Sequence, residues 1–165
     1  MSGKLVTLLL KLPRNSEVTP EATQTFLAAL VNINYISRGL FNFSKQKAKP
    51  FALEIVKANG IIWFQITCHP ELVPLIETQI HSNYPLCVIE KIDDPIAEKN
   101  QLLNVVYVKI KSGDYYPLNT YTHFKDIDPL ASILSVLSKS NPQEIAIVQF
   151  ALESVSESWQ RSGKQ

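Results

Sequence analysis

The dipeptide Asn59-Gly60 constrains the fold more than any other feature of the sequence. It lies between two alternating runs, Phe51 to Ala58 and Ile61 to Cys68. A two-residue type I′ turn needs positive φ at both central positions, and Asn and Gly tolerate this best, so the pattern predicts a β-hairpin. With both residues in the turn, Ala58 faces Ile61, and the remaining pairs of the hairpin follow from that one.

The expected register gives the hairpin two different faces. A sheet that helices cover on one side is expected to show one apolar and one half-polar face. The apolar face collects Phe51, Leu53, Ile55, Phe64, Ile66 and Cys68. The half-polar face collects Ala52, Glu54, Val56, Ala58, Ile61, Trp63, Gln65 and Thr67.

Apolar periodicity and helix signals place this hairpin inside a longer series of elements. In order, we expect a strand at 4–13, a helix at 19–34, the hairpin at 51–68, a helix from 70 to 84 and a strand at 86–92. The order β-α-β-β-α-β predicts an α+β fold in which residues 1–92 form a ferredoxin-like antiparallel sheet with two helices.

The second half of the chain is expected to extend this fold. Residues 93–101 are polar and predict a linker, and residues 153–165 predict a polar tail or a further linker. Between them, residues 102–152 predict a β-β-α-β unit packed on or beside the first half. Its elements are strands at 102–111 and 115–118, a helix that Asp128-Pro129 begins and Asn141-Pro142 ends, and a strand at 144–152.

Composition excludes several classes of protein. The chain has 165 residues, with 16 Lys and Arg against 15 Asp and Glu, so its net charge of +1 is unlike that of a dedicated nucleic-acid binder. Two cysteines are too few for a disulfide scaffold, and the apolar run Leu5 to Leu12 is too short to span a membrane. We therefore expect a cytoplasmic domain; if it works at a membrane, a partner or another segment must hold it there.

The sequence has no pattern for binding a nucleotide phosphate. Its five glycines are isolated from one another, and no G-x-x-x-x-G-K-[ST] motif occurs. The chain is therefore not itself a P-loop ATPase. We expect no catalytic residue, no cofactor and no metal.

Two chemical alternatives involve the cysteines. Cys68, His69, His81 and Cys87 are zinc-ligand types, but no C-x₂-C spacing joins them, and adjacent Cys68 and His69 point to opposite sides of a strand end. Cys68 as a nucleophile with His81 or His123 as its base is conceivable from residue type alone. Core cysteines and surface histidines explain the same residues more simply.

The half-polar face of the hairpin holds one candidate interaction surface. Val56, Ile61 and Trp63 make that face more apolar than a solvated sheet requires. Exposed apolar patches mark contact surfaces, so these three residues are candidates for binding another protein. The alternative is that the second half of the chain covers them.

The segment before the hairpin holds a candidate nucleic-acid contact. Cations there alternate with aromatic residues, as in loops that follow phosphates and stack on bases. A solvated loop is the competing interpretation. The residues are Arg38, Phe41, Phe43, Lys45, Lys47 and Lys49.

Two blocks of the sequence carry a family resemblance. The first comprises Leu8 to Arg14, Thr19 to Glu21, Phe51 to Val56, Ile62 to Ile66 and Asn83 to Pro85. The second comprises Tyr116 to Tyr121, Asp128 to Ala131, Leu137 to Lys139, Glu144, Gln149-Phe150 and Ser158-Trp159. Together they resemble the N-terminal region of bacterial ATPases related to type IV secretion and conjugative-transfer motors and to HerA-like helicases.

The resemblance implies a function without implying a catalytic site. In such proteins a linker and a RecA-like ATPase domain follow this region, and no catalytic residue of the family maps onto this chain. The expectation is a non-catalytic assembly or docking domain of a secretion or DNA-translocation ATPase, with proteins as partners. The alternative is a single-stranded nucleic-acid-binding domain that uses the sheet face around Trp63 and the basic 38–49 loop.

Overall fold

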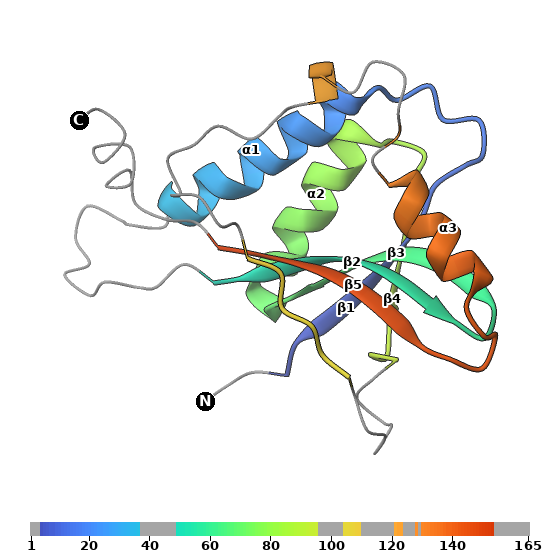
Figure 1. Ribbon diagram of the computed structural model, residues 1–165. Coiled ribbons are helices and arrows are strands. Elements are labelled where there is room, and N and C mark those ends of the chain that lie inside the picture. The colour runs from blue at the N-terminus through green and yellow to red at the C-terminus, as the bar shows by residue number, and fades with distance from the viewer. Residues whose placement is uncertain are drawn as a thin grey trace, which may run out of the picture.

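One antiparallel sheet of five strands, with three α-helices on one side of it, makes up the described fold (Figure 1). The computed structural model describes residues 4–36, 49–95, 104–109, 121–123, 128 and 130–153. The elements are β1 (Val6–Lys11), α1 (Pro20–Ile36), β2 (Phe51–Ala58), β3 (Ile61–Cys68), α2 (Val73–Asn83), β4 (Val88–Ile92), α3 (Ala131–Lys139) and β5 (Ala146–Leu152), with 3₁₀ turns at Pro70–Leu72 and Tyr121–His123. No helix in the described segments is long and apolar enough to cross a bilayer.

The hairpin forms with the expected turn and register. Asn59 has φ 50° and Gly60 has φ 75°, so both central residues of the turn lie in the left-handed region. The pairs run without a break from Ala58 and Ile61 to Phe51 and Cys68. The observed turn and register of β2 and β3 therefore confirm the predicted hairpin.

The first four strands have the ferredoxin-like order β4-β1-β3-β2. β1 lies between β3 and β4, which explains why it is apolar along most of its length. The helices α1 and α2 pack on the face that carries Phe51 and Ile66 and close the main core. The buried members of this core are Leu8, Phe26, Leu30, Phe51, Ile66, Cys68, Val73, Ile76, Ile80 and Cys87.

The second half of the chain contributes to the same sheet. β5 pairs antiparallel with β2, and Ile147 lies opposite Val56. Residues 144–152 were expected to form a strand, and β5 occupies most of that range. The extension is therefore a fifth strand beside the first half.

A buried lysine anchors α3 above the sheet. Lys57 continues the alternation of Phe51, Leu53 and Ile55 along β2, so it lies on the same face of the sheet. It is only 2% exposed. Its ammonium group donates to the carbonyl of Ser140 at 3.2 Å, to the Ser140 hydroxyl at 2.9 Å, and to the carbonyl of Asn141. A cation at the C-terminus of a helix also meets the negative end of the helix dipole.

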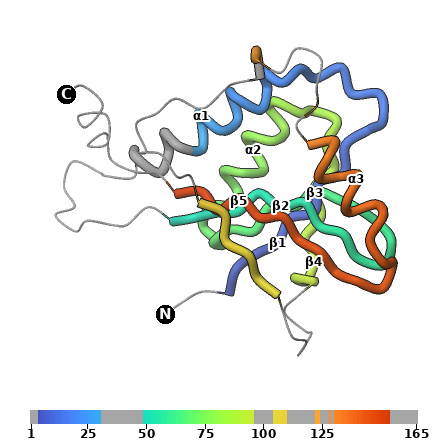
Figure 2. Tube along the Cα trace, in the orientation of Figure 1, coloured from blue at the N-terminus to red at the C-terminus, as the bar shows by residue number. Residues whose placement is uncertain are grey.

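The expected strand at 102–111 is wrong over its described part. Residues 104–109 pair with no described strand and run as an extended, exposed segment, coloured yellow in the tube trace (Figure 2). A high β-propensity does not make a strand unless a neighbouring strand bonds its N–H and C=O groups. The remaining residues of that expected strand and the expected strand at 115–118 lie outside the described residues.

Candidate functional site

The sheet face opposite the helices holds a buried hydrogen-bond network centred on Glu54. Strand pairing places Leu9, Gln65, Glu54 and Gln149 in one row across four strands. Glu54 is 7% exposed and Gln65 is 2% exposed. Polar side chains therefore occupy the middle of a face where solvent is largely excluded.

Glu54 accepts three hydrogen bonds through its two oxygens. One oxygen accepts from the Gln149 amide at 2.6 Å. The other accepts from the Gln65 amide at 2.7 Å and from the Thr67 hydroxyl at 2.8 Å. Because buried carboxylates are costly unless hydrogen bonded, these donors compensate for the loss of water.

The network extends to β1 and to Trp63. The Trp63 indole N–H donates to the Gln65 side-chain oxygen at 2.8 Å, which fixes the orientation of that amide. The hydroxyls of Thr7 and Thr67 are 3.3 Å apart, and Thr7 donates because the Thr67 proton points to Glu54. The carboxylate on β2 thus bonds residues of β3 and β5, and the contact between Thr67 and Thr7 extends the network to β1.

The three residues predicted as an interaction surface do not form one exposed patch. Val56 is fully buried, Trp63 is half-buried, and Ile61 is 65% exposed. β5 pairs with β2 within the sheet, so Ile147 lies directly beside Val56. Only Ile61 is openly available to a partner.

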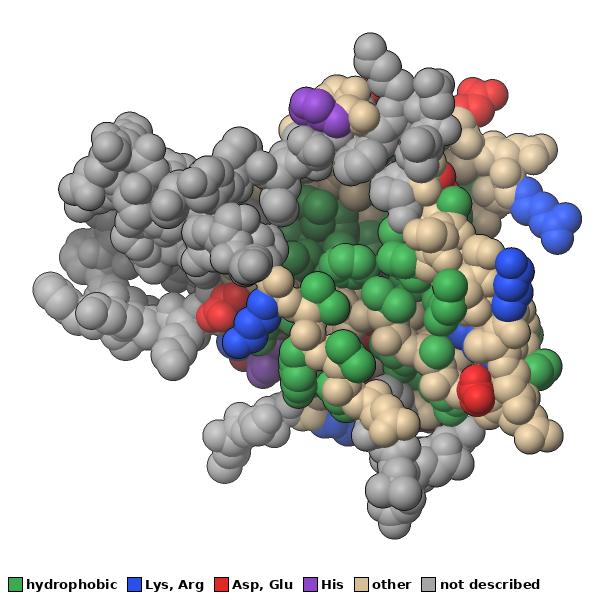
Figure 3. All heavy atoms as spheres, in the orientation of Figure 1, with side chains coloured by type: hydrophobic (Ala, Val, Ile, Leu, Met, Phe, Trp, Pro, Cys, Tyr) green, Lys and Arg blue, Asp and Glu red, His purple; other side chains and the backbone are tan. Residues whose placement is uncertain are grey.

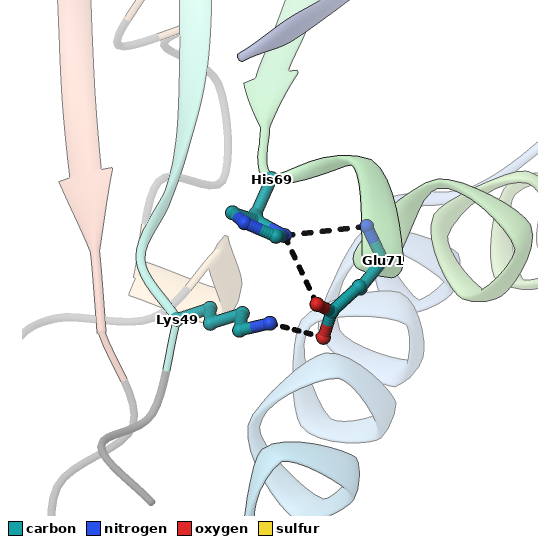
Figure 4. Close-up of polar contacts among 3 residues, drawn as sticks. All are labelled: Lys49, His69 and Glu71. Atoms are coloured by element: carbon teal, nitrogen blue, oxygen red, sulfur yellow. Dashed lines mark hydrogen bonds and ion pairs between the residues drawn. The ribbon is translucent and has the colours of Figure 1, made fainter. Parts of the chain in front are cut away.

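Lys49 is the one described residue of the predicted nucleic-acid contact. Its ammonium group pairs with the Glu71 carboxylate, and the His69 ring nitrogen accepts the Glu71 backbone N–H at 3.3 Å (Figure 4). The hydrogen bond from Lys49, followed by its charge, lowers the pKa of Glu71. The other five predicted residues, Arg38, Phe41, Phe43, Lys45 and Lys47, lie outside the described residues.

The two cysteines belong to the core. Both are buried and unpaired, and the described residues contain no group of three or more metal-ligating side chains. Burial, together with the nearby negative charge of Glu77, raises the pKa of Cys68 from 9.0 to about 11. Burial also raises the pKa of Cys87, partly offset by a hydrogen bond from the Lys11 backbone. Neither thiol is poised as a nucleophile at neutral pH.

We expect both thiols to resist alkylation in the folded protein at about pH 8 and to react in urea, because unfolding restores an ordinary thiol. The Cys68 thiolate forms more easily after unfolding. The raised pKa of Cys68 therefore adds to the free energy of unfolding in full below pH 9.0, and this contribution is lost as the pH rises toward 11. Iodoacetamide labelling followed by mass spectrometry tests the reactivity of the thiols. Ser82→Cys, at an exposed position of α2, is the reactive control. Rapid native labelling of Cys68 would contradict this assignment.

One surface cavity of about 320 Å³ lies where β1 ends and β4 begins. It is apolar over most of its lining, and none of the residues predicted as an interaction surface or nucleic-acid contact lines it. Among the lining residues are Leu12, Pro13, Val18, Tyr84, Leu86 and Cys87. The Cys87 thiol is protonated there, so this pocket offers packing surface rather than a reactive group.

Among the described residues, the longest run of exposed apolar side chains lies in the second half of the chain. Val105, Val106, Tyr107 and Val108 are consecutive and are 61%, 85%, 84% and 93% exposed. On β5, Phe150 is 48% exposed. Hydrophobic side chains also gather in the middle of the face shown in Figure 3. Such surface is uncommon on a monomer and is typical of a contact with another protein.

Comparison with known proteins gives a family. Residues 3–165 match the family described as a domain of unknown function, DUF8128. The chain belongs to the DUF8128 family. Neither the curated proteins nor the solved structures provided a match. For this DUF8128 domain, the fold and the side-chain contacts are therefore the basis for any functional inference.

Sequence reasoning missed the two main features of this DUF8128 domain for different reasons. The alternation of β2 and β3 already placed Glu54, Gln65 and Thr67 on one face, so the network had a signal in the register. The exposure of residues 105–108 had none, because a Val-rich run predicts a paired strand wherever it occurs. Only the sheet order shows that no described strand pairs with them.

Proposed function

We propose that this DUF8128 domain is a non-catalytic protein-interaction module that assembles or docks a secretion or DNA-translocation ATPase. The observation that carries the proposal is the run Val105 to Val108, in which each side chain is more than 60% exposed. Four consecutive apolar side chains in water are unfavourable, and a protein partner would cover them.

The state of the reactive side chains supports a role in assembly. The Glu54 carboxylate already accepts three hydrogen bonds from neighbouring strands. Burial holds the Cys68 and Cys87 thiols in their protonated forms. These groups stabilise the fold, and their positions do not suggest a reaction.

The choice of an ATPase as the assembled machine rests on the sequence resemblance. Because this chain lacks a P-loop motif, ATP hydrolysis would belong to a separate RecA-like domain. The domain described here would then bring motor subunits together or dock them on other components.

The test is to join this chain to the N-terminus of a monomeric RecA-like ATPase domain and measure the mass in solution by light scattering. We expect the fusion to form a defined oligomer larger than that of the isolated chain, whereas the ATPase domain alone stays monomeric. A fusion that assembles no further than the isolated chain would contradict the proposal. Binding of single-stranded DNA by the isolated chain at low salt, lost in Trp63→Ala, would favour the nucleic-acid function instead.

A further inference from the structure

The outer edge of β5 is available for pairing in the described structure. β5 pairs with β2 on one side, and no described strand pairs with its other side. Its sequence, AIVQFAL, spans seven residues with no charge and no proline. Natural edge strands are usually protected by charges, prolines or bulges, so this edge is well suited to accept another strand.

The opposite edge of the sheet has the expected protection. β4 is five residues long and carries Glu90 and Lys91 near its centre. Glu90 also pairs with the Lys11 ammonium group on the neighbouring strand at 2.6 Å. A strand added to β4 would meet these charges, whereas a strand added to β5 would meet none.

Residues 104–109 have the character of a strand that lacks a partner. They read NVVYVK and contain three β-branched residues and one Tyr, the types that favour strands. All six residues are exposed, and the segment lies outside the ladder of its own sheet (Figure 2). Its single charge, Lys109, is at one end, so it would bring no like-charge pair to β5 in either orientation.

We propose that residues 104–109 of one copy of this chain pair with the free edge of β5 in a second copy. Such pairing hydrogen-bonds two sets of backbone groups that no described strand pairs, and it covers Val105 to Val108 at the same time. Reciprocal exchange between two copies closes a two-fold dimer, the commonest symmetry of homo-oligomers. The inference rests on the proposed function, because it names the partner through which assembly begins.

The first test is the mass of the whole chain across a concentration series. We expect a dimer whose dissociation constant is raised at least about tenfold by Val106→Lys in the donor segment or Phe150→Lys in the acceptor strand. Ala151→Lys, also exposed on β5, serves if Phe150→Lys unfolds. Val88→Lys on β4 is the matched control, since Val88 is 54% exposed on the other edge and its change should leave the dimer intact.

The second test identifies the strands that meet. Chains with Val106→Cys and chains with Ala151→Cys are mixed and treated with a short bis-maleimide. Both native thiols are buried. We expect a covalent product that contains one chain of each kind. In a chain that carries both substitutions, linkage within that one chain would overturn the proposal. Linkage between two Ala151→Cys chains, or a monomeric mass at all concentrations, would also overturn it.

The two tests separate this inference from the proposed function. If the isolated chain stays monomeric while its fusion to an ATPase domain still forms an oligomer, the strand exchange is wrong and assembly proceeds through another surface. If the exchanged dimer forms while the fusion assembles no further than the chain alone, the strand exchange stands. The role in building an ATPase is then wrong.

Discussion

Replacing Lys57 with Met should lower the free energy of unfolding by about 3 kcal/mol. The ammonium group donates to two carbonyls and one hydroxyl at the C-terminal end of α3. Met fills a similar volume but donates nothing, so the Ser140 and Asn141 carbonyls lose a charged donor at a partly buried site. The variant also loses the favourable contact of a cation with the helix C-terminus, worth up to about 2 kcal/mol in partly buried geometries.

Urea unfolding followed by circular dichroism measures this loss. Lys11→Met is the matched control, because the Lys11 side chain is 52% exposed and pairs with Glu90 on the surface. Exposed ion pairs contribute about 0 to 1 kcal/mol, so the control should stay close to the wild type. Equal stability of Lys57→Met and Lys11→Met would show that the buried ammonium group does not hold α3.

Lys57 also shows what the sequence can reveal when register is considered. It occupies the position after Phe51, Leu53 and Ile55 on the apolar face, where a lysine is unusual. The register therefore places its side chain toward the helices, but the partner comes from residues 140 and 141, more than 80 positions later. The position of a non-local partner depends on packing, and local pattern does not contain it.

The same distinction explains which elements the sequence predicted. The hairpin follows from Asn59 and Gly60, whose backbone preferences act within the turn itself. The run at 104–109 has an equally strong local preference for a strand, yet no described strand lies beside it. Strand formation requires a neighbour, so propensity alone gave the correct outcome for β5 and the wrong one for residues 104–109.

The Glu54 network gives the second large prediction. Its hydrogen-bond donors differ in how easily they can find other partners once the carboxylate is removed. Replacing Glu54 with Leu removes the acceptor for Gln65, Thr67 and Gln149. Gln149 is exposed and can turn to water, but Gln65 is 2% exposed and its oxygen is held by the Trp63 indole. We expect a loss of about 3 kcal/mol in the free energy of unfolding, mostly because the buried Gln65 amide would have no acceptor.

Glu54→Gln separates hydrogen bonding from charge at the same position. Its oxygen can still accept from Gln65 and Thr67, while its new amide group faces Gln149, which is exposed and can rotate to present its own oxygen. The cost should therefore be about 1 kcal/mol, well below that of Leu. Urea unfolding of both variants compares them directly. If Gln and Leu destabilise equally, the negative charge matters and hydrogen-bond geometry does not explain the network. If neither destabilises, the network does not hold β5 to β2.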